Sequence, residues 1–454
     1  MIFNDHDTIV APATPTGGAL CIIRISGEDA ITICDKIFRG RKSLLDARAS
    51  SVLYGNIVDG DEVIDDVLVS LFRAPHSYTG ENAVELSAHG SRYTVERIIA
   101  LITKHGARLA EAGEFTRRAF LSGRMDLSQA EAVADIIAAD SRASHAIAST
   151  QMRGAYSLEL QNLRDNLLNI TSLLELELDF SEEDVEFADR TQLLELLELT
   201  HQRVELLARS FALGNALKEG IQVAIAGRPN VGKSTLLNRL AGEDRAMVSD
   251  IAGTTRDTVE VTTNIAGVMY RFIDTAGLHS TDDRLEQMGI ERTTEALRKA
   301  RIILWLTDDE QSSFEADLIG YTPSAEQQVY RIITKCDIAR SADNAPTPTD
   351  YPTLRLSART GEGVEELIST LQSAADATDA YRGEVIVSNH RHHEALRQAS
   401  EALTAALEAL HNGIPTDLMS EDIRLAIHHL GTITGAITSE DILKNIFSHF
   451  CIGK

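Results

Sequence analysis

The chain has 454 residues, of which 43% are hydrophobic and 24% charged, an ordinary composition for a globular protein of about three domains. Its 43 Lys and Arg against 68 Asp and Glu give a net charge of −25, which disfavours direct nucleic-acid binding unless a basic patch or a partner supplies the contact. No apolar run approaches the roughly 20 residues of a membrane span, no secretory signal pattern opens the chain, and the few cysteines are scattered, so we expect a cytoplasmic protein with no membrane role.

Residues 1–122 mix two periodicities. The apolar runs Ala19–Ile25 and Val67–Phe72 predict strands, and Tyr93–Lys104 has the spacing of a helix. We therefore expect an α+β domain over this segment.

Residues 123–215 are predicted to be helical, with few glycines and no proline. A stripe of 3.6-residue period consists of Leu158, Leu160, Leu163, Leu167, Leu168, Ile170, Leu174, Leu176 and Leu178. Helical patterns return over residues 380–454, where Thr438–Asp441 resembles a capping box that opens a last helix. Because these segments flank an α/β block, residues 216–379, we expect one all-α domain with the block inserted into it.

The inserted block alternates strand and helix patterns. Its strand candidates are residues 221–226, 258–265, 269–273, 301–307, 328–334 and 353–357. This alternation predicts a parallel, doubly wound sheet whose functional loops lie at the carboxyl ends of the strands.

A phosphate-binding loop follows the first of these strands. Gly227–Thr235 reads Gly-Arg-Pro-Asn-Val-Gly-Lys-Ser-Thr and fits the pattern G-x-x-x-x-G-K-[ST] between a predicted strand and a predicted helix. Backbone N–H groups of such a loop wrap the phosphates, Lys233 reaches the β- and γ-phosphate oxygens, and Ser234 holds Mg²⁺. The block is therefore predicted to be a P-loop nucleotide-binding domain.

Further GTPase motifs follow in order. Asp274–Gly277 closes a strand beside Mg²⁺ and the γ-phosphate, and Thr255 is the natural Mg²⁺ ligand of a switch loop. Asp337 is expected to accept the guanine N1 and N2 hydrogens, which adenine lacks. The residues expected to contact GTP are Asn230, Val231, Gly232, Lys233, Ser234, Thr235, Ser249, Asp250, Ile251, Ala252, Gly253, Thr254, Thr255, Asp274, Thr275, Ala276, Gly277, Thr334, Lys335, Asp337, Ser357, Ala358 and Arg359.

Two positions depart from the usual GTPase pattern. The base-reading motif begins with Thr334 where Asn is usual, and losing one neutral hydrogen bond costs about 1 kcal/mol, so we expect weaker nucleotide binding with the guanine preference kept. Leu278 stands where Ras-type enzymes use a glutamine to orient the attacking water. Asn230 and the loop over residues 249–254 could instead hold a monovalent cation beside the phosphates, which predicts potassium-stimulated hydrolysis.

Segments outside the nucleotide-binding block indicate a more specific family. The chain resembles the tRNA uridine-modification GTPases of the MnmE (TrmE) family over essentially its whole length. The segments that carry the resemblance are Asp7–Gly18, Ile23–Gly27, Ser77–Asn82, Glu85–Gly90, Gly113–Phe120, Asp126–Ala132 and Phe450–Lys454.

The resemblance implies a folate-binding and dimerisation domain over residues 1–122, a helical domain of two segments, and a GTPase inserted between them. It implies a homodimer whose GTPase heads meet across bound potassium. It also implies a flavoprotein partner, MnmG, in a heterotetramer. Together they would modify carbon 5 of the wobble uridine of certain tRNAs, with a 5-formyl or methylene tetrahydrofolate derivative as one-carbon donor.

The resemblance also assigns residues. Arg24, Glu85, Arg124 and Lys454 would contact the folate. The potassium ligands would be Asn230, Ser249, Ile251 and Thr254, and the magnesium ligands Ser234 and Thr255. Glu286 would orient the catalytic water, beside Asn230 and Lys233.

Some features leave alternatives open. Cys451 is either a thiol that takes part in the modification chemistry or a small apolar residue that packs the last helix. We interpret His390, His392 and His393 as a solvated or partner-facing cluster rather than a metal site. The alternative function is a ribosome-assembly GTPase that acts as an RNA-binding switch, against which the negative charge and the folate-like N-terminus argue.

Overall fold

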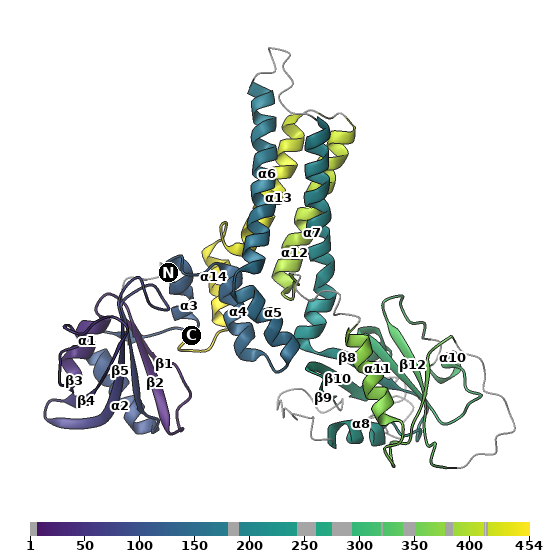
Figure 1. Cartoon of the computed structure of the whole chain (residues 1–454), viewed down its shortest axis with the longest axis horizontal. Helices are drawn as coiled ribbons and strands as arrows, with labels where there is room; N and C mark the ends of the chain where they lie inside the picture. The colour runs from purple at the N-terminus through teal and green to yellow at the C-terminus, as the bar shows by residue number, and fades with distance from the viewer. Residues whose placement is uncertain are drawn as a thin grey trace. The chain divides into compact units, whose positions relative to one another are not determined.

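The computed structural model describes residues 7–179, 190–242, 260–274, 293–318, 321–338, 350–376, 385–412, 414 and 416–454. The chain divides into two compact units. One comprises Met1–Ala134, Gln151–Asp179 and Ser420–Lys454, and the other comprises Asp135–Thr150 and Phe180–Met419. Each unit contains one β-sheet together with helices (Figure 1).

The first unit contains a seven-stranded sheet in the order β3-β4-β5-β6-β2-β1-β7. Its strands are β1 (Ile9–Pro12), β2 (Leu20–Ser26), β3 (Phe38–Gly40), β4 (Ser51–Asp59), β5 (Glu62–Phe72), β6 (Ala83–His89) and β7 (Arg108–Leu109). Neighbouring strands are antiparallel, except that β7 runs parallel to β1. The two predicted strands are confirmed as β2 and β5, although β5 begins earlier, at Glu62.

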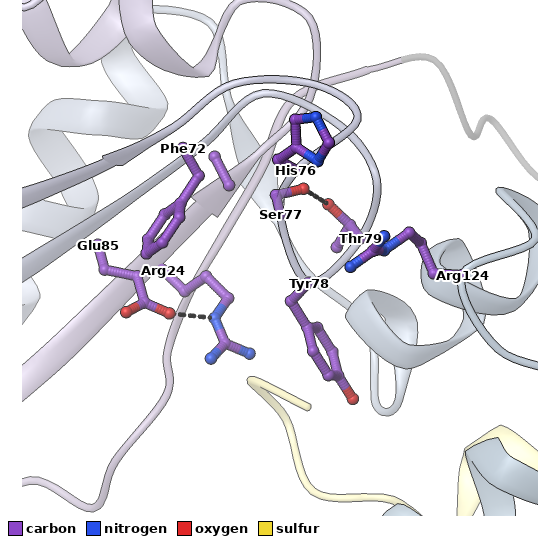
Figure 2. A pocket seen from close by; sticks show the side chains of 9 residues that line it. Arg24, Phe72, His76, Ser77, Tyr78, Thr79, Glu85 and Arg124 are labelled. Carbon is purple, nitrogen blue, oxygen red and sulfur yellow. Dashed lines mark hydrogen bonds and ion pairs between the residues drawn. The ribbon is translucent and has the colours of Figure 1, made fainter. Parts of the chain in front are cut away.

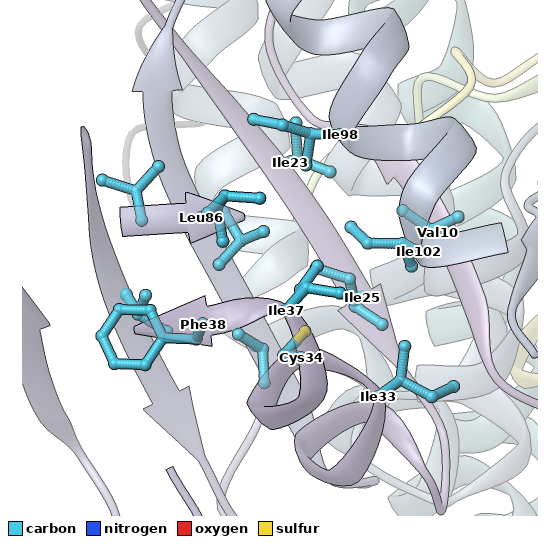
Figure 3. Packing of buried hydrophobic residues seen from close by; sticks show 14 of the residues in the cluster. Val10, Ile23, Ile25, Ile33, Cys34, Ile37, Phe38, Leu86, Ile98 and Ile102 are labelled. Carbon is cyan, nitrogen blue, oxygen red and sulfur yellow. The ribbon is translucent and has the colours of Figure 1, made fainter. Parts of the chain in front are cut away.

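Helices α1 (Ala30–Ile37) and α2 (Arg92–Lys104) pack on one face of this sheet, and α2 confirms the predicted helix. Side chains at alternate strand positions meet the helices there: Ile23 of β2 lies beside Ile98 of α2, and Ile25 lies beside Ile37 of α1 (Figure 3). Burial raises the pKa of the Cys34 thiol in this core, which keeps the thiol protonated and inert. The other face of the sheet is free of these helices, so its side chains are available for a site.

A buried ion network joins the start of the sheet to helix α3 (Glu114–Leu121). The Glu114 carboxylate is fully buried and accepts hydrogen bonds from Arg108 Nη2 at 2.6 Å and from Arg118 Nη2 at 2.9 Å. Burial alone would raise the pKa of Glu114, but the bonds from Arg108, the Glu111 backbone and Arg118 outweigh it and lower the pKa to about 2. The network therefore depends on an ionised carboxylate in the interior.

This lowered pKa predicts acid sensitivity. Because the folded-state pKa of Glu114 lies below its ordinary 4.5, its contribution to stability is present above pH 4.5 and is lost as the pH falls towards about 2. We expect Glu114→Gln to lower the free energy of unfolding by about 3 kcal/mol at pH 7 and by progressively less below pH 4.5. Urea unfolding of the whole chain between pH 7 and pH 3 measures this.

The matched control is Glu96→Gln, which removes an exposed carboxylate from the Arg92 ion pair on α2. It should change stability by less than about 0.5 kcal/mol at every pH. A constant difference between Glu114→Gln and the unmodified protein over the whole pH range would contradict the prediction.

The helical parts confirm the expected helices. They are α4 (Leu127–Ala138), α5 (Arg142–Met152), α6 (Ala155–Asp179), α7 (Arg190–Glu219), α12 (His390–His411), α13 (Thr416–Thr434) and α14 (Glu440–Ser448). The predicted leucine stripe on α6 is partly wrong, because Leu158 and Leu168 are exposed whereas Leu160, Leu163 and Leu167 are buried. Positions 158 and 168 lie off the i, i+3, i+7 line that faces the core.

Two local predictions need correction. The last helix is capped by Ser439, whose hydroxyl accepts from the Ile442 N–H, and not by Thr438 one residue earlier. The prediction of a solvated histidine cluster holds for His390, which is exposed, but is wrong for His392, which is 1% exposed, and the partly buried His393 ring stacks on Phe211 of α7 at 4.4 Å. Within the described residues no group of side chains has the composition of a metal site.

The second unit contains a six-stranded sheet in the order β13-β12-β11-β8-β10-β9. Its strands are β8 (Ile221–Ala226), β9 (Glu260–Ile265), β10 (Val268–Asp274), β11 (Ile302–Thr307), β12 (Gln328–Ile333) and β13 (Thr353–Arg355). The prediction of an all-parallel sheet is wrong at one edge, where β9 is antiparallel to β10. The two-residue turn Ala266–Gly267 explains this: both residues have positive φ, as a type I′ hairpin turn requires.

Helices α8 (Lys233–Gly242), α10 (Phe314–Asp317) and α11 (Val364–Asp376) accompany this sheet. Strands β8 and β11 lie at its centre and are buried along their length, as expected for parallel strands covered on both faces. Among the described helices, none has the length and apolarity that crossing a membrane requires.

Candidate functional site

The phosphate-binding loop connects the central strand β8 to helix α8. At Gly227 the backbone has φ +147° and passes so close to β11 that a Cβ atom would lie 2.0 Å from the Leu306 carbonyl oxygen, so only glycine fits. Asn230 and Gly232 also have positive φ. These conformations, followed by a helix N-terminus, give the concave array of N–H groups that holds phosphate oxygens.

The lysine of the loop is held in place by the loop itself. Lys233 is buried, and its ammonium donates to the carbonyls of Gly227 and Arg228, each at 2.7 Å. The cation therefore lies against the loop backbone, where a bound phosphate would meet it. Ser234 follows at the first turn of α8, which suits its predicted role as a Mg²⁺ ligand.

Thr334 ties the base-reading loop to the phosphate loop. Its hydroxyl donates to the Val231 carbonyl at 2.6 Å, and its backbone N–H donates to the Thr307 carbonyl at 2.8 Å. The threonine thus makes the link between the two loops through one hydroxyl. That hydroxyl proton is then engaged and cannot also be donated to a guanine base.

Asp337 is oriented for base recognition. Its Oδ1 accepts from the Ser357 hydroxyl at 2.7 Å, so the two predicted base-reading motifs are in direct contact. This hydrogen bond lowers the pKa of Asp337 and keeps the carboxylate ionised. Lys335 of the same loop has φ +60° and pairs with Asp308 at 2.8 Å.

We expect Thr334→Asn to tighten GDP binding about fivefold, because an amide can hold the Val231 carbonyl and still offer a group to the base, worth about 1 kcal/mol. Calorimetric titration with GDP and ADP measures it, and the preference for guanine over adenine should not change. Thr334→Val tests the opposite change: it removes the hydrogen bond between the base-reading loop and the phosphate loop, so it should weaken GDP binding. Equal affinities for all three proteins would contradict the prediction.

Several predicted residues lie outside the described residues. They are Ser249, Asp250, Ile251, Ala252, Gly253, Thr254, Thr255, Thr275, Ala276, Gly277 and Glu286, together with the side chain of Asp274. The backbone of Asp274 ends β10 and pairs with Ile225 of β8, directly before the phosphate loop. Ala358 and Arg359 follow Ser357, and helix α8 reaches them through Arg239, which donates to the Arg359 carbonyl.

A second candidate site lies in the first unit. Three of the four predicted folate residues, Arg24, Glu85 and Arg124, line one pocket of about 350 Å³ (Figure 2). Arg24 Nε donates to Glu85 Oε1 at 2.9 Å across the β2–β6 pair. The pocket therefore offers a carboxylate acceptor beside two guanidinium groups, which suits a ligand with both N–H donors and anionic groups.

Sequence reasoning missed the aromatic part of this pocket. Tyr78 lines it, and the Arg24 guanidinium lies 5.1 Å from the centre of the Tyr78 ring. Burial raises the pKa of Tyr78, and its hydroxyl is 2.9 Å from Thr116 Oγ1. Phe72 and His76 also line the pocket and lie at the end away from Tyr78 in the view (Figure 2). The signal for Tyr78 in the sequence is its place in Ser77–Asn82, one of the segments that carry the family resemblance.

The C-terminal tail reaches the same neighbourhood. The Gly453 carbonyl accepts from Arg24 Nη1 at 3.4 Å, and Ile452 forms a bridge with Ala112. Lys454 is next in the chain but is not among the residues that line the pocket. The Cys451 side chain is exposed, so the alternative that it packs the last helix is not supported.

Comparison with known proteins places these features in a family context. The model of the MnmE helical domain matches residues 127–451, and that of the GTP-binding protein TrmE N-terminus matches residues 8–124. A tRNA modification GTPase MnmE of Bacteroides fragilis is 47% identical over 99% of this chain and 100% of its own length. Its counterpart of Porphyromonas gingivalis is 48% identical over 100% of this chain and 99% of its own. Among solved structures, Aquifex aeolicus Era bound to GDP.AlF4- is 26% identical over 40% of this chain and 66% of that chain, with a TM-score of 0.26.

Proposed function

The chain belongs to the MnmE family of tRNA modification GTPases, and on that premise we propose that it modifies carbon 5 of the wobble uridine of certain tRNAs together with the flavoprotein MnmG. As a member it is a GTP hydrolase that binds GTP and Mg²⁺ and acts in tRNA modification. The proposal extends this to a tetrahydrofolate one-carbon donor, potassium-stimulated hydrolysis and a homodimer. It keeps the four domain ranges 1–122, 123–215, 216–379 and 380–454, and a cytoplasmic location, where tRNA is found.

The observation that carries the folate part is the pocket of the first unit. When bound, a tetrahydrofolate derivative supplies a one-carbon unit. Glu85 would accept its pterin N–H groups, and Arg24 and Arg124 would face its carbonyl or carboxylate oxygens. The aromatic ring of Tyr78 adds a flat surface beside Arg24, which suits a planar heterocycle.

The nucleotide part is carried by the phosphate and base loops. Lys233 would neutralise the β- and γ-phosphate charge, Ser234 would hold Mg²⁺, and Asp337 would select guanine. Asn230 supports the potassium proposal because it lies inside the phosphate loop with a positive φ and its side chain is exposed, so its amide oxygen is available to a cation. GTP turnover in potassium chloride should exceed that in sodium chloride at equal ionic strength, and equal rates would overturn this part.

Nucleoside analysis of tRNA tests the whole proposal. Cells that lack the protein should contain unmodified wobble uridine in the affected tRNAs, and the gene supplied on a plasmid should restore the modification. The protein should also co-purify with a flavoprotein. Unchanged tRNA nucleosides together with co-purification of a ribosomal subunit would favour the alternative of ribosome assembly.

The open face of the seven-stranded sheet supports the homodimer. Cross-strand partners share a face, and the register places Tyr54 of β4 opposite Leu68 of β5 on the side away from α1 and α2. Both are exposed, at 67% and 48%, as is Val52 on the same face. An exposed apolar group of this kind on a sheet face is typical of a protein interface.

We expect Tyr54→Glu to convert the dimer into monomers, because a charge in an apolar interface is left without a partner. Light scattering during size-exclusion chromatography measures the mass. The matched control is Tyr93→Glu, an equally exposed tyrosine on α2, which should leave the mass unchanged. A Tyr54→Glu protein that remains dimeric, or an unmodified protein that is monomeric, would contradict the prediction.

A further inference from the structure

A fully buried carboxylate contacts the phosphate loop from outside the nucleotide motifs. The Asp317 side chain, at the end of helix α10, is 0% exposed. Its Oδ1 lies 2.5 Å from Nε of Arg228, the second residue of the loop, in an ion pair without aligned hydrogen-bond geometry. Neither Asp317 nor the Arg228 side chain belongs to the nucleotide-binding pattern, so the pair needs an explanation of its own.

The other oxygen of this carboxylate is bonded to the chain's single tryptophan. Trp305 Nε1 donates to Asp317 Oδ2 at 2.9 Å. The indole lies in β11, is 1% exposed, and packs edge-on against Phe314 with ring centres 5.5 Å apart. The Arg331 guanidinium lies 5.1 Å from the indole centre. Trp305 is thus fixed on several sides, with charged groups both at its N–H and over its ring.

Arg228 is connected to the lysine of the site through its backbone. Its carbonyl accepts from Lys233 Nζ at 2.7 Å, while its side chain reaches Asp317. Strand β11 also contacts the phosphate loop, because Gly227 lies directly against Leu306, the neighbour of Trp305. A movement of the loop would therefore move the Arg228 cation relative to the carboxylate that holds the indole N–H.

We propose that Asp317 is a positioning residue that holds the phosphate loop through Arg228, and that Trp305 senses through the same carboxylate whether the loop is engaged with a nucleotide. A buried carboxylate without a cation is costly, so Asp317 favours loop conformations that keep Arg228 close. Such a loop has part of its ordering completed before the nucleotide arrives, which strengthens binding. The emission of an indole depends on the charges around it, so the tryptophan reports the state of the pair.

Fluorescence and nucleotide binding test the proposal on the full-length protein. GDP should change the Trp305 emission of the unmodified protein in a saturable titration. In Arg228→Gln the dissociation constant for GDP, measured by calorimetry, should rise about tenfold, because the ion pair that holds the loop is lost. At saturating GDP the change in Trp305 emission of Arg228→Gln should be less than half of the change in the unmodified protein. The KM for GTP should rise by a similar factor, with kcat nearly unchanged, because the pair acts on binding rather than on the reacting atoms.

Conservative and control variants separate this role from stability. Arg228→Lys keeps a cation and should recover most of the affinity and of the emission change. Glu295→Gln removes an exposed ion pair with Lys299 in the same unit and should match the unmodified protein. Arg228→Gln leaves the buried Asp317 carboxylate without its cation, so circular dichroism and thermal unfolding are measured to check that the variant is folded at the assay temperature.

Two results would overturn the proposal. One is a tryptophan emission that does not respond to GDP in the unmodified protein. The other is an Arg228→Gln protein with unchanged GDP affinity and an unchanged emission response, since the pair would then serve stability alone.

Discussion

Asp337→Asn is expected to exchange guanine recognition for xanthine recognition. The Asp337 carboxylate, oriented by Ser357, would accept two hydrogen bonds from the guanine edge, each worth about 1.5–3 kcal/mol because the acceptor is charged. An amide offers one donor and one acceptor, which repels the guanine N2 amino group and matches the O2 carbonyl of xanthine. We expect GTP affinity to fall at least about a hundredfold.

Xanthosine triphosphate serves as the internal control for this variant. It should be hydrolysed by Asp337→Asn at a rate close to that of GTP with the unmodified protein, because the phosphate loop and Lys233 are untouched. Calorimetry and phosphate release measure the two steps separately. If the variant binds neither GTP nor the xanthine nucleotide, the substitution has disrupted the fold or the base-reading loop. If the variant still binds GTP as tightly as the unmodified protein, Asp337 does not recognise the base.

Arg24→Ala is expected to impair the proposed folate site while leaving GTP hydrolysis at the nucleotide site unaffected. Arg24 lines the pocket that we propose for the folate, and it contacts Glu85, Tyr78 and the C-terminal tail. Its loss would remove the charged hydrogen bond proposed between Arg24 and the folate, so binding of a tetrahydrofolate derivative should weaken at least about tenfold and tRNA modification should fall with it. GTP hydrolysis by the purified protein should stay within about twofold, because the nucleotide residues belong to the other unit.

The control lies in the same domain. Arg97→Ala removes an arginine of α2 from an ion pair with Glu62 outside the pocket, and should leave folate binding and modification unchanged. Arg24→Lys keeps the positive charge but lacks the planar donors of arginine. Its affinity for the folate derivative should lie between those of the unmodified protein and Arg24→Ala. Equal losses of GTP hydrolysis and modification in Arg24→Ala would show that the effect is not local to the pocket.

Local patterns were sufficient for the strands and helices of the nucleotide block. Strand β8 has the predicted bounds 221–226, and the phosphate loop connects it to a helix as its motif requires. The periodicity of apolar residues determines such elements because each buries one face or stripe. It did not reveal the antiparallel edge strand β9, whose direction depends on two positive φ angles in a turn that has no common hairpin dipeptide.

By itself, the sequence determined the order of the nucleotide motifs and the roles expected of Lys233 and Asp337, since these are local patterns of side-chain chemistry. Arg24, Glu85 and Arg124 followed only from the family resemblance, and Tyr78 did not follow from it. Only the tertiary structure decided which of them touch. The Thr334 hydroxyl reaches Val231 across 103 positions of sequence, and Arg24 meets the tail at Gly453 across 429. The ion pair between the half-exposed Arg228 and the buried Asp317 is another contact of this kind. Sheet order and packing create such contacts, and no local period in the sequence encodes them.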